Sequence, residues 1–304
     1  MRKLISNLFF LGLITAATIA IIVMISPHDT NNYLAAAIDK HRLLYSVESP
    51  RIILVGGSNI AFSVDSQKLE KRFGIPVINM GLHAGLGLNF MLNEVKPALK
   101  SEDIVVIFPE YEHFYSLPLD GRPLELGTVV KFCRECISVI TIEQLPISIR
   151  GILQLTENDI LHIRASKDIY VRQGFNQWGD MVFHLDQADR KILANHILPI
   201  KIISPNPAVD ALNSFYKSAA QNKVRVFLMF PAIPIIEYNA QKEDFSTLND
   251  FLHAELDIPL LGNPQDFIYP KKMFYDTVYH MNRTGRDNRT NRIIDLLTPL
   301  LQND

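Results

Sequence analysis

Three polar residues, one near the start of the chain and two near its end, have side chains that can combine in nucleophilic catalysis. Ser58 follows two glycines that end the apolar run 52–55, and Asp276 and His280 lie four residues apart near the C-terminus. A serine hydroxyl becomes a nucleophile when an imidazole accepts its proton and a carboxylate orients that imidazole. These residue types predict acyl transfer through Ser58, with His280 as the base and Asp276 as its orienting partner.

Several residues that follow apolar runs are candidates for stabilising an oxyanion beside Ser58. Gly57 allows a tight turn before the nucleophile, and Asn79, Gly81 and Gly85 follow the second apolar run. Backbone N–H groups of Ser58 and of Gly81 or Gly85 are the expected donors, because preorganised N–H groups stabilise developing negative charge. Taken singly, each of these segments is also typical of an ordinary turn.

A second polar cluster follows the third apolar run and consists of Glu110, Tyr111, Glu112 and His113. Glu110 and Tyr111 are candidates for lining a substrate pocket, and the carboxylates for binding a cation. The simpler interpretation, which we favour, places these carboxylates on a solvated loop. Trp178 lies further along the chain and indicates either a platform that faces a sugar or a packed loop.

The elements that would position these residues alternate between short apolar runs and helical patterns. We expect buried strands at 52–55, 76–79, 103–108 and 224–230, and helices at 64–73, 88–100, 209–220 and 284–301. Strands separated by helices indicate right-handed crossovers, one parallel sheet and helices on both of its faces. In such sheets ligands bind beyond the carboxyl ends of the strands, where the candidate residues lie.

The N-terminal segment is predicted to anchor the chain in a membrane. No charged residue occurs between Leu4 and Ile25, and at about 1.5 Å per residue this stretch spans a hydrocarbon core of about 30 Å. Arg2 and Lys3 precede it, so the positive-inside rule predicts a cytoplasmic N-terminus with the remainder outside. A cleaved signal peptide is the alternative, although its apolar part is normally shorter.

Length and composition indicate one large domain behind this segment. The chain has 304 residues, of which 48% are hydrophobic and 20% charged, and its 30 Lys and Arg balance 32 Asp and Glu. This balance gives no electrostatic signature of nucleic-acid binding. We expect an anchor at 1–28, a linker at 29–50 and an α/β domain at 51–304, with a largely helical insertion at about 116–200.

The two cysteines, Cys133 and Cys136, form a Cys-x-x-Cys pair. This spacing is compatible with structural thiols or a local disulfide, with a redox pair, or with half of a metal site. A zinc site would need two further ligands, and the sequence shows none at suitable spacing. We therefore predict neither a metal nor a cofactor.

The order of these motifs resembles the SGNH (GDSL-like) hydrolases. The shared pattern is Gly-Gly-Ser58 after the first strand, Asn79-x-Gly81 after the second, and Asp276 with His280-x-Asn before the last helix. The resemblance covers about residues 51–301. It implies a flavodoxin-like, three-layer αβα sandwich whose first block carries the nucleophile, whose second and third blocks carry oxyanion donors, and whose last block completes the triad.

The C-terminal motif is similar to that of membrane-anchored members that accompany O-acylation of envelope polymers. Examples are the accessory protein of teichoic-acid D-alanylation and the alginate O-acetylation proteins, which work beside membrane-bound O-acyltransferases. The resemblance implies a single-pass protein of the inner membrane with a periplasmic domain. It implies an O-acyltransferase or esterase acting on an envelope polysaccharide or another acyl acceptor, with a membrane-bound O-acyltransferase as a candidate partner.

The chain departs from the family pattern at three places. Gly57 occupies the position of the usual Asp, Glu110 and Tyr111 follow the third strand where the family has an Asn, and the spacing from Asp276 to His280 is one residue longer. The missing donor leaves an alternative open, in which a catalytically degenerate SGNH domain binds a glycan or a protein partner without turnover.

Overall fold

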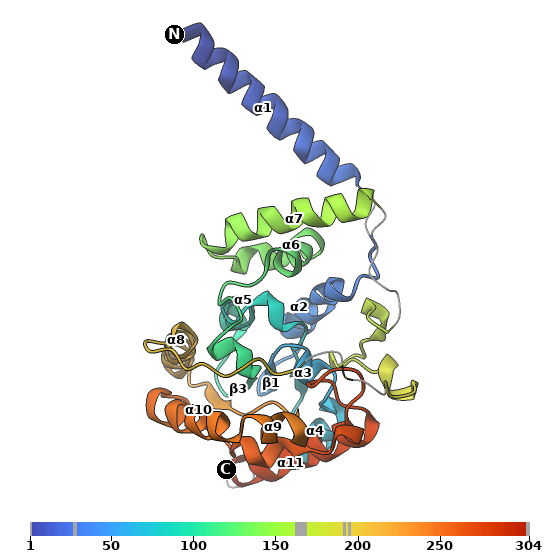
Figure 1. Cartoon of the computed structure of the whole chain (residues 1–304), viewed down its shortest axis with the longest axis vertical. Helices are drawn as coiled ribbons and strands as arrows, with labels where there is room; N and C mark the ends of the chain where they lie inside the picture. Colours follow the sequence, from blue (N-terminus) through green and yellow to red (C-terminus); the bar gives the residue numbers. More distant parts are fainter. Residues whose placement is uncertain (1, 27–28, 162–168, 191–192, 194–195, 302–304) are drawn as a thin grey trace.

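The computed structural model describes residues 2–26, 29–161, 169–190, 193 and 196–301. Figure 1 shows an α/β domain from which the N-terminal helix α1 (Arg2–Ile25) projects. The domain places helices against both faces of a parallel sheet. This confirms the predicted α/β class and the central parallel sheet.

The central sheet has four parallel strands in the order β2-β1-β3-β4. Their bounds are β1 (Ile52–Gly56), β2 (Val77–Asn79), β3 (Ile104–Phe108) and β4 (Arg225–Leu228). Leu228 also forms a parallel bridge to Leu260, which adds a short fifth position beside β4. The order β2-β1-β3-β4 is found in doubly wound sheets, which bind ligands at the switch point between β1 and β3.

The helices fall close to the predicted ranges. The elements are α2 (Ala37–Ser46), α3 (Ser58–Ala61), α4 (Ser66–Phe73), α5 (Leu88–Val95), α6 (Pro123–Phe132), α7 (Gln144–Ile160), α8 (Pro207–Gln221), α9 (Ile235–Ala240), α10 (Lys242–Glu255) and α11 (Arg283–Leu301). Two short strands, β5 (Ile233–Pro234) and β6 (Ile268–Tyr269), pair in parallel as a separate sheet. The helix expected at 88–100 ends earlier, at Val95, and a 3-10 turn that contains Pro97 follows it. Proline has no backbone N–H and therefore cannot donate the hydrogen bond that would continue the α-helix.

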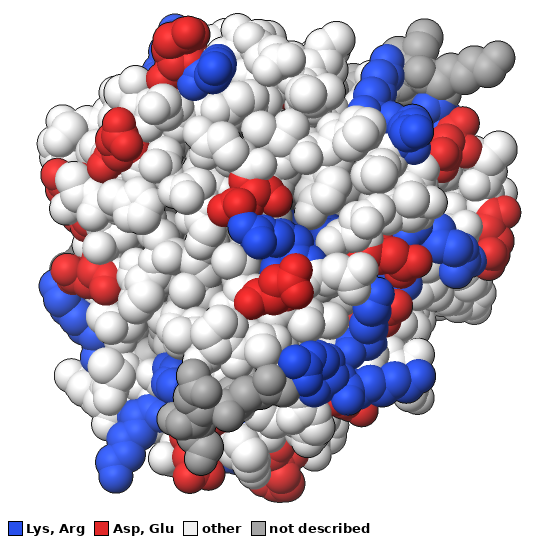
Figure 2. Space-filling view, turned by 90° about the horizontal axis from the view of Figure 1, so that it is seen from below, with Lys and Arg blue, Asp and Glu red and all other residues white. Residues whose placement is uncertain are grey.

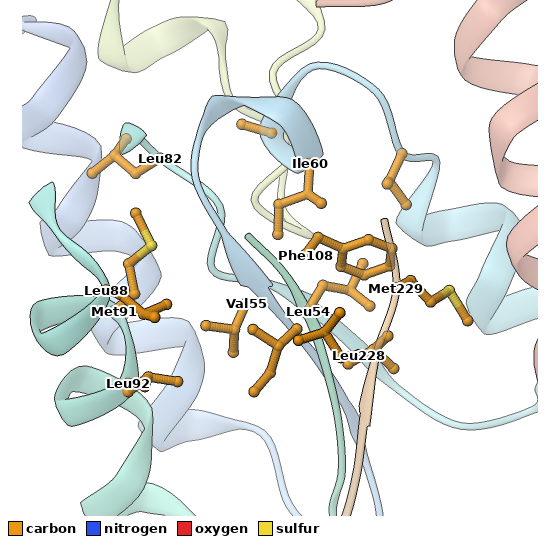
Figure 3. Close-up of a cluster of buried hydrophobic side chains, with 14 of the residues drawn as sticks. Leu54, Val55, Ile60, Leu82, Leu88, Met91, Leu92, Phe108, Leu228 and Met229 are labelled. Carbon is orange, nitrogen blue, oxygen red and sulfur yellow. The ribbon is translucent and has the colours of Figure 1, made fainter. Parts of the chain in front are cut away.

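Alternating side chains of the strands pack against the two helical layers. Figure 3 shows Val55 of β1 facing Leu88 and Met91 of α5, whereas Leu54 lies on the side of Ile60 of α3. All five side chains are buried. Burying a side chain of this size contributes about 1.5–3 kcal/mol, so the two layers hold the β1–α3 turn from both sides.

The insertion begins with two helices in close contact. A Cβ atom at Gly127 of α6 would lie 2.4 Å from the backbone nitrogen of Ile152 in α7, and one at Gly151 would collide with Pro123 O. Glycine therefore lets these helix backbones touch. The described part after residue 168 is irregular and holds only the 3-10 turns η6 (Arg172–Gly174) and η7 (Phe183–Asp186) before α8, so the helical pattern is confined to the first half.

Helix α1 meets the domain at the C-terminal half of α7. Ile22 and Val23 share a pocket with Leu153 and Ile160 of α7. Within the part of the chain that the structure describes, no helix meets the length and apolarity required to span a membrane.

Candidate functional site

Asp276 and His280 lie in a compact loop that immediately precedes α11. The ends of this loop pair, since the Tyr275 N–H donates to His280 O at 2.8 Å. Thr277 Oγ1 also accepts from the His280 N–H at 3.1 Å. This local folding brings His280 Nδ1 to 2.9 Å from Asp276 Oδ1, with both side chains more than nine-tenths buried. The structure therefore joins the predicted carboxylate and imidazole.

The segment after Ser58 fixes the position of the imidazole. The His280 ring stacks on Phe62, with centroids 3.9 Å apart and ring planes at 7°. Ser63 Oγ donates to Tyr279 O at 2.9 Å and accepts from the Met281 N–H at 3.1 Å. Both neighbours of His280 are thus hydrogen-bonded to one serine, Ser63, which holds His280 beside α3, the helix that begins with Ser58.

Ser58 occupies the first position of α3, and its side chain is partly exposed whereas its neighbours are buried. β1 ends at Gly56, where a Cβ atom would lie 2.6 Å from Phe108 O. The strand therefore approaches β3 closely at the turn, and the serine is presented at the carboxyl edge of the sheet. This edge, beside the β1/β3 switch point, is where parallel sheets bind ligands.

Tyr170 is a member of the site that no sequence pattern indicated. Its hydroxyl donates to Asp276 Oδ2 at 2.6 Å and lies 3.2 Å from His280 Nδ1. Although burial acts to raise the pKa of Asp276, hydrogen bonds from His280 and Tyr170 and the charge of His280 hold it below its usual value. Tyr170 therefore helps keep the carboxylate ionised and oriented.

If Asp276 and His280 act together in catalysis, replacing Tyr170 with phenylalanine is expected to lower kcat by about 10- to 100-fold, since a hydrogen bond to a charged group contributes about 1.5–3 kcal/mol. The ring packing against Phe62 is retained in this variant, so KM should change little. The melting temperature should fall by a few degrees, because the same hydrogen bond also stabilises the fold. Steady-state kinetics and a thermal melt test this expectation. An unchanged kcat would show that Asp276 is oriented without Tyr170.

The predicted oxyanion donors are already engaged in hydrogen bonds. The Gly81 N–H donates to Asn79 Oδ1 at 2.9 Å, and the Gly85 N–H donates to His83 Nδ1 at 3.0 Å. Asn79 Nδ2 donates to Asp180 Oδ1 at 2.8 Å and to a carbonyl of α3, so this side chain belongs to a buried network. The oxyanion role of the Gly81 and Gly85 N–H groups stays a prediction. It requires each N–H group to leave its present acceptor and donate to the oxyanion instead.

Glu110 lies directly against the turn between β1 and α3, at Gly57 and Asn59. Its Oε1 accepts from the Asn59 N–H at 3.3 Å, while its buried Oε2 has no hydrogen-bond partner among the described residues and lies 3.4 Å from His113 Nδ1. A Cβ atom at Gly57 would collide with this carboxylate and lie 2.7 Å from Ala84 N. The Glu110 carboxylate therefore fills the space that any side chain at position 57 would need.

The interpretation of the cluster at 110–113 as a solvated loop is wrong. Glu110 is 2% exposed and Tyr111 1%, because β3 continues into a buried 3-10 turn, η4 (Tyr111–Phe114). Glu112 accepts from Tyr279 Oη at 2.5 Å, which links this turn to the His280 loop. Tyr111 packs against Phe245 with ring centroids 4.8 Å apart, so the structure places it in the aromatic core.

Two further predicted features have defined surroundings. Cys133 and Cys136 form a disulfide, which selects one of the interpretations left open by their spacing. The Trp178 indole N–H donates to Glu70 Oε2 at 3.0 Å, and the Trp178 carbonyl accepts from the Asn79 N–H at 2.8 Å. These contacts favour the packed-loop interpretation of Trp178.

The surface opposite α1 carries charges of both signs. Figure 2 shows Lys and Arg side chains interspersed with Asp and Glu on the face seen from below, opposite α1. No protein-family model matches the chain, and a search of curated proteins finds no match.

Proposed function

We propose that the protein is a serine-dependent acyl-transfer enzyme with Ser58 as its nucleophile. The observation that carries the proposal is the buried pair of Asp276 and His280, 2.9 Å apart, whose imidazole stacks on the residue that caps the C-terminal end of α3. A carboxylate, an imidazole and a serine at a strand-to-helix turn are the groups needed for acyl transfer.

In the proposed reaction His280 Nδ1–H donates to Asp276, which leaves Nε2 free to accept the Ser58 proton. Ser58 Oγ then attacks the carbonyl carbon of an ester, and the tetrahedral intermediate collapses as His280 returns the proton to the departing alkoxide. The acyl-Ser58 ester is next attacked by a hydroxyl group, which gives transfer, or by water, which gives hydrolysis. His280 removes the proton of that second nucleophile and passes it back to Ser58.

The family, substrate and location are further parts of this proposal. The strand order supports an SGNH-type, flavodoxin-like sandwich. The motif resemblance supports an O-acyltransferase or esterase that acts on an envelope glycan or another acyl acceptor. It also supports a membrane-bound O-acyltransferase as the partner. The Cys133–Cys136 disulfide supports a periplasmic domain, since disulfides persist in oxidising compartments.

The proposed inner-membrane anchor rests on the uncharged sequence Leu4–Ile25 and on a row of apolar side chains on α7. Leu145, Ile149 and Leu153 follow one another at intervals of four residues and are each more than 40% exposed. Residues four apart share one helix face, and this helix adjoins α1. An apolar face beside the anchor supports contact of α7 with the lipid surface.

Labelling of the full chain in detergent with a fluorophosphonate tests the proposed nucleophile. This probe reacts with activated serines, so we expect one adduct, located at Ser58 by mass spectrometry. Labelling should disappear in Ser58→Ala and persist in Ser46→Ala, which changes an exposed serine of α2. A folded wild-type chain that takes up no probe, or takes it up at another serine, would contradict the proposal.

A second candidate function is glycan or partner binding by a degenerate site. It is favoured by the Glu110 carboxylate, whose negative charge adjoins the nucleophile turn, and by the engaged N–H groups of Gly81 and Gly85. Under this alternative the probe does not label Ser58, and Ser58→Ala leaves glycan binding unchanged in a pull-down assay with envelope polysaccharide.

A further inference from the structure

A cluster of potential metal ligands lies apart from the candidate catalytic site, at the junction of α2, α5 and the 3-10 turn η5 (Glu135–Val139). His41 comes from α2, Glu94 from α5 and Cys136 from η5, while Cys133 caps the C-terminal end of α6. Ligand atoms of His41 and the two cysteines all lie within 4.8 Å of one another. Cys136 Sγ lies 4.0 Å from His41 Nδ1 and 3.9 Å from Glu94 Oε1.

Glu94 provides an independent indication of a ligand. Its Oε1 lies 2.6 Å from His41 Nδ1, but its Oε2 is buried without a hydrogen-bond partner among the described residues. The residue is 5% exposed, and burial raises the pKa of its carboxyl. A buried, unpaired carboxylate oxygen is costly unless something binds it. Here the carboxylate adjoins the Cys136 sulfur and the His41 imidazole.

We propose that reduction of the Cys133–Cys136 disulfide converts this cluster into a site for Zn²⁺ or a similar thiophilic divalent cation. The four ligands are the two cysteine thiolates, His41 Nδ1 and the Glu94 carboxylate. In the oxidised chain the two sulfurs are bonded to each other and the site does not form.

Metal–ligand bonds of about 2.0–2.3 Å place neighbouring ligand atoms about 3.3–3.8 Å apart in a tetrahedron. The separations of 3.9 and 4.0 Å around Cys136 need to shorten by a few tenths of an ångström. The bonded sulfurs, 1.99 Å apart, and His41 Nδ1 with Glu94 Oε1, 2.6 Å apart, need to separate to that spacing once the disulfide opens. The Cys136 N–H donates to Cys133 Sγ at 3.3 Å, and such a bond favours the thiolate once the disulfide is broken.

The reduction is a balanced thiol–disulfide exchange with a dithiol reductant. One reductant thiolate attacks a cysteine sulfur and forms a mixed disulfide, and the second reductant thiolate displaces that cysteine as its own group is oxidised. The protein S–S bond breaks, and the two cysteines gain two electrons and two protons. Zn²⁺ then binds the thiolates and releases those protons to solvent. The cysteines are buried, but Arg134, Glu135 and Ile137 beside them are exposed, so only a local opening of η5 is needed.

Cobalt binding to the full chain in detergent, purified either without reductant or under phosphine reductant throughout, tests the proposal. The reduced chain should show two free thiols and bind one Co²⁺ with thiolate-to-cobalt charge transfer and the absorption of a tetrahedral ion. Zn²⁺ should displace the cobalt and protect both cysteines from alkylation. The oxidised chain should bind neither metal.

Variants separate a built site from adventitious binding. His41→Ala and Glu94→Gln should each weaken Zn²⁺ binding at least about tenfold and abolish protection of the cysteines. His196→Ala is the matched control, because His196 Nδ1 also lies 2.7 Å from a glutamate, Glu237. Unlike His41, His196 is largely exposed and belongs to no metal-ligand cluster found among the described residues. Equal binding by oxidised and reduced chains, a disulfide that resists the reductant, or unchanged affinity in Glu94→Gln would overturn the proposal.

Discussion

Replacing Asp276 with asparagine is expected to lower kcat for hydrolysis of p-nitrophenyl acetate by about 10⁴-fold. In the wild-type chain His280 Nδ1 lies 2.9 Å from Asp276 Oδ1. The asparagine amide has nearly the shape of this carboxylate but presents a donor as well as an acceptor to His280 Nδ1. A ring that accepts at Nδ1 carries its proton on Nε2 and cannot take the proton of Ser58. Steady-state kinetics measure this loss.

The matched control for this change is Asp186→Asn. Asp186 is exposed and pairs with Arg283 at the start of α11, so its replacement alters a carboxylate close to the same loop without touching the imidazole. Its kcat should stay within about twofold, because exposed ion pairs contribute little. Circular dichroism should show both variants folded. An Asp276→Asn variant with wild-type kcat would show that His280 is not oriented by this carboxylate.

Replacing Asp103 with alanine is expected to reduce the free energy of unfolding by about 3–5 kcal/mol. Asp103 precedes β3 and forms a buried ion pair with Arg51, which precedes β1, at 3.2 Å; the side chains are 0% and 1% exposed. Arg51 also donates to the carbonyl of Ala98 at 2.6 Å, so its guanidinium is held in place. Removing the carboxylate leaves a positive charge buried without a counter-ion. Urea denaturation measures the change.

Asp257→Ala serves as the comparison for this stability prediction. Asp257 pairs with Lys217 at 3.0 Å, but these side chains are 47% and 72% exposed. Solvent screens such a pair, so its loss should cost less than about 1 kcal/mol. If Asp103→Ala and Asp257→Ala destabilise the chain equally, the buried pair contributes no more to stability than a surface pair does.

The sheet and the Asp276–His280 pair could be predicted because local patterns specify them. Ile52–Val55 and Ile104–Phe108 are uninterrupted apolar runs, which is how strands buried on both faces appear in a sequence. Asp276 and His280 lie within one short loop, so their contact depends on local folding. The short sequence separation of Asp276 and His280 and the apolar runs of the strands are both visible in a single sequence.

The remaining features depend on tertiary packing and had no local signal. Tyr170 precedes an irregular segment with no hydrophobic period, yet it reaches an aspartate 106 residues away. His41 and Glu94 lie on separate helices that pack on one turn, so the sequence showed only the two cysteines of that cluster. Glu110 was predicted to be solvated because charged residues usually are, whereas its burial follows from how the β3 end packs against Gly57.

The candidate site can form only after the last helix, α11, has been synthesised. Arg289 of α11 is fully buried and donates to Asn59 O, beside the nucleophile, across 230 residues of sequence. At about 5–20 residues per second, a ribosome needs roughly 10–50 s to make the intervening chain. Until α11 docks, the turn at Ser58 lacks the arginine that holds it. Under the proposed function, an incomplete chain is therefore expected to be inactive.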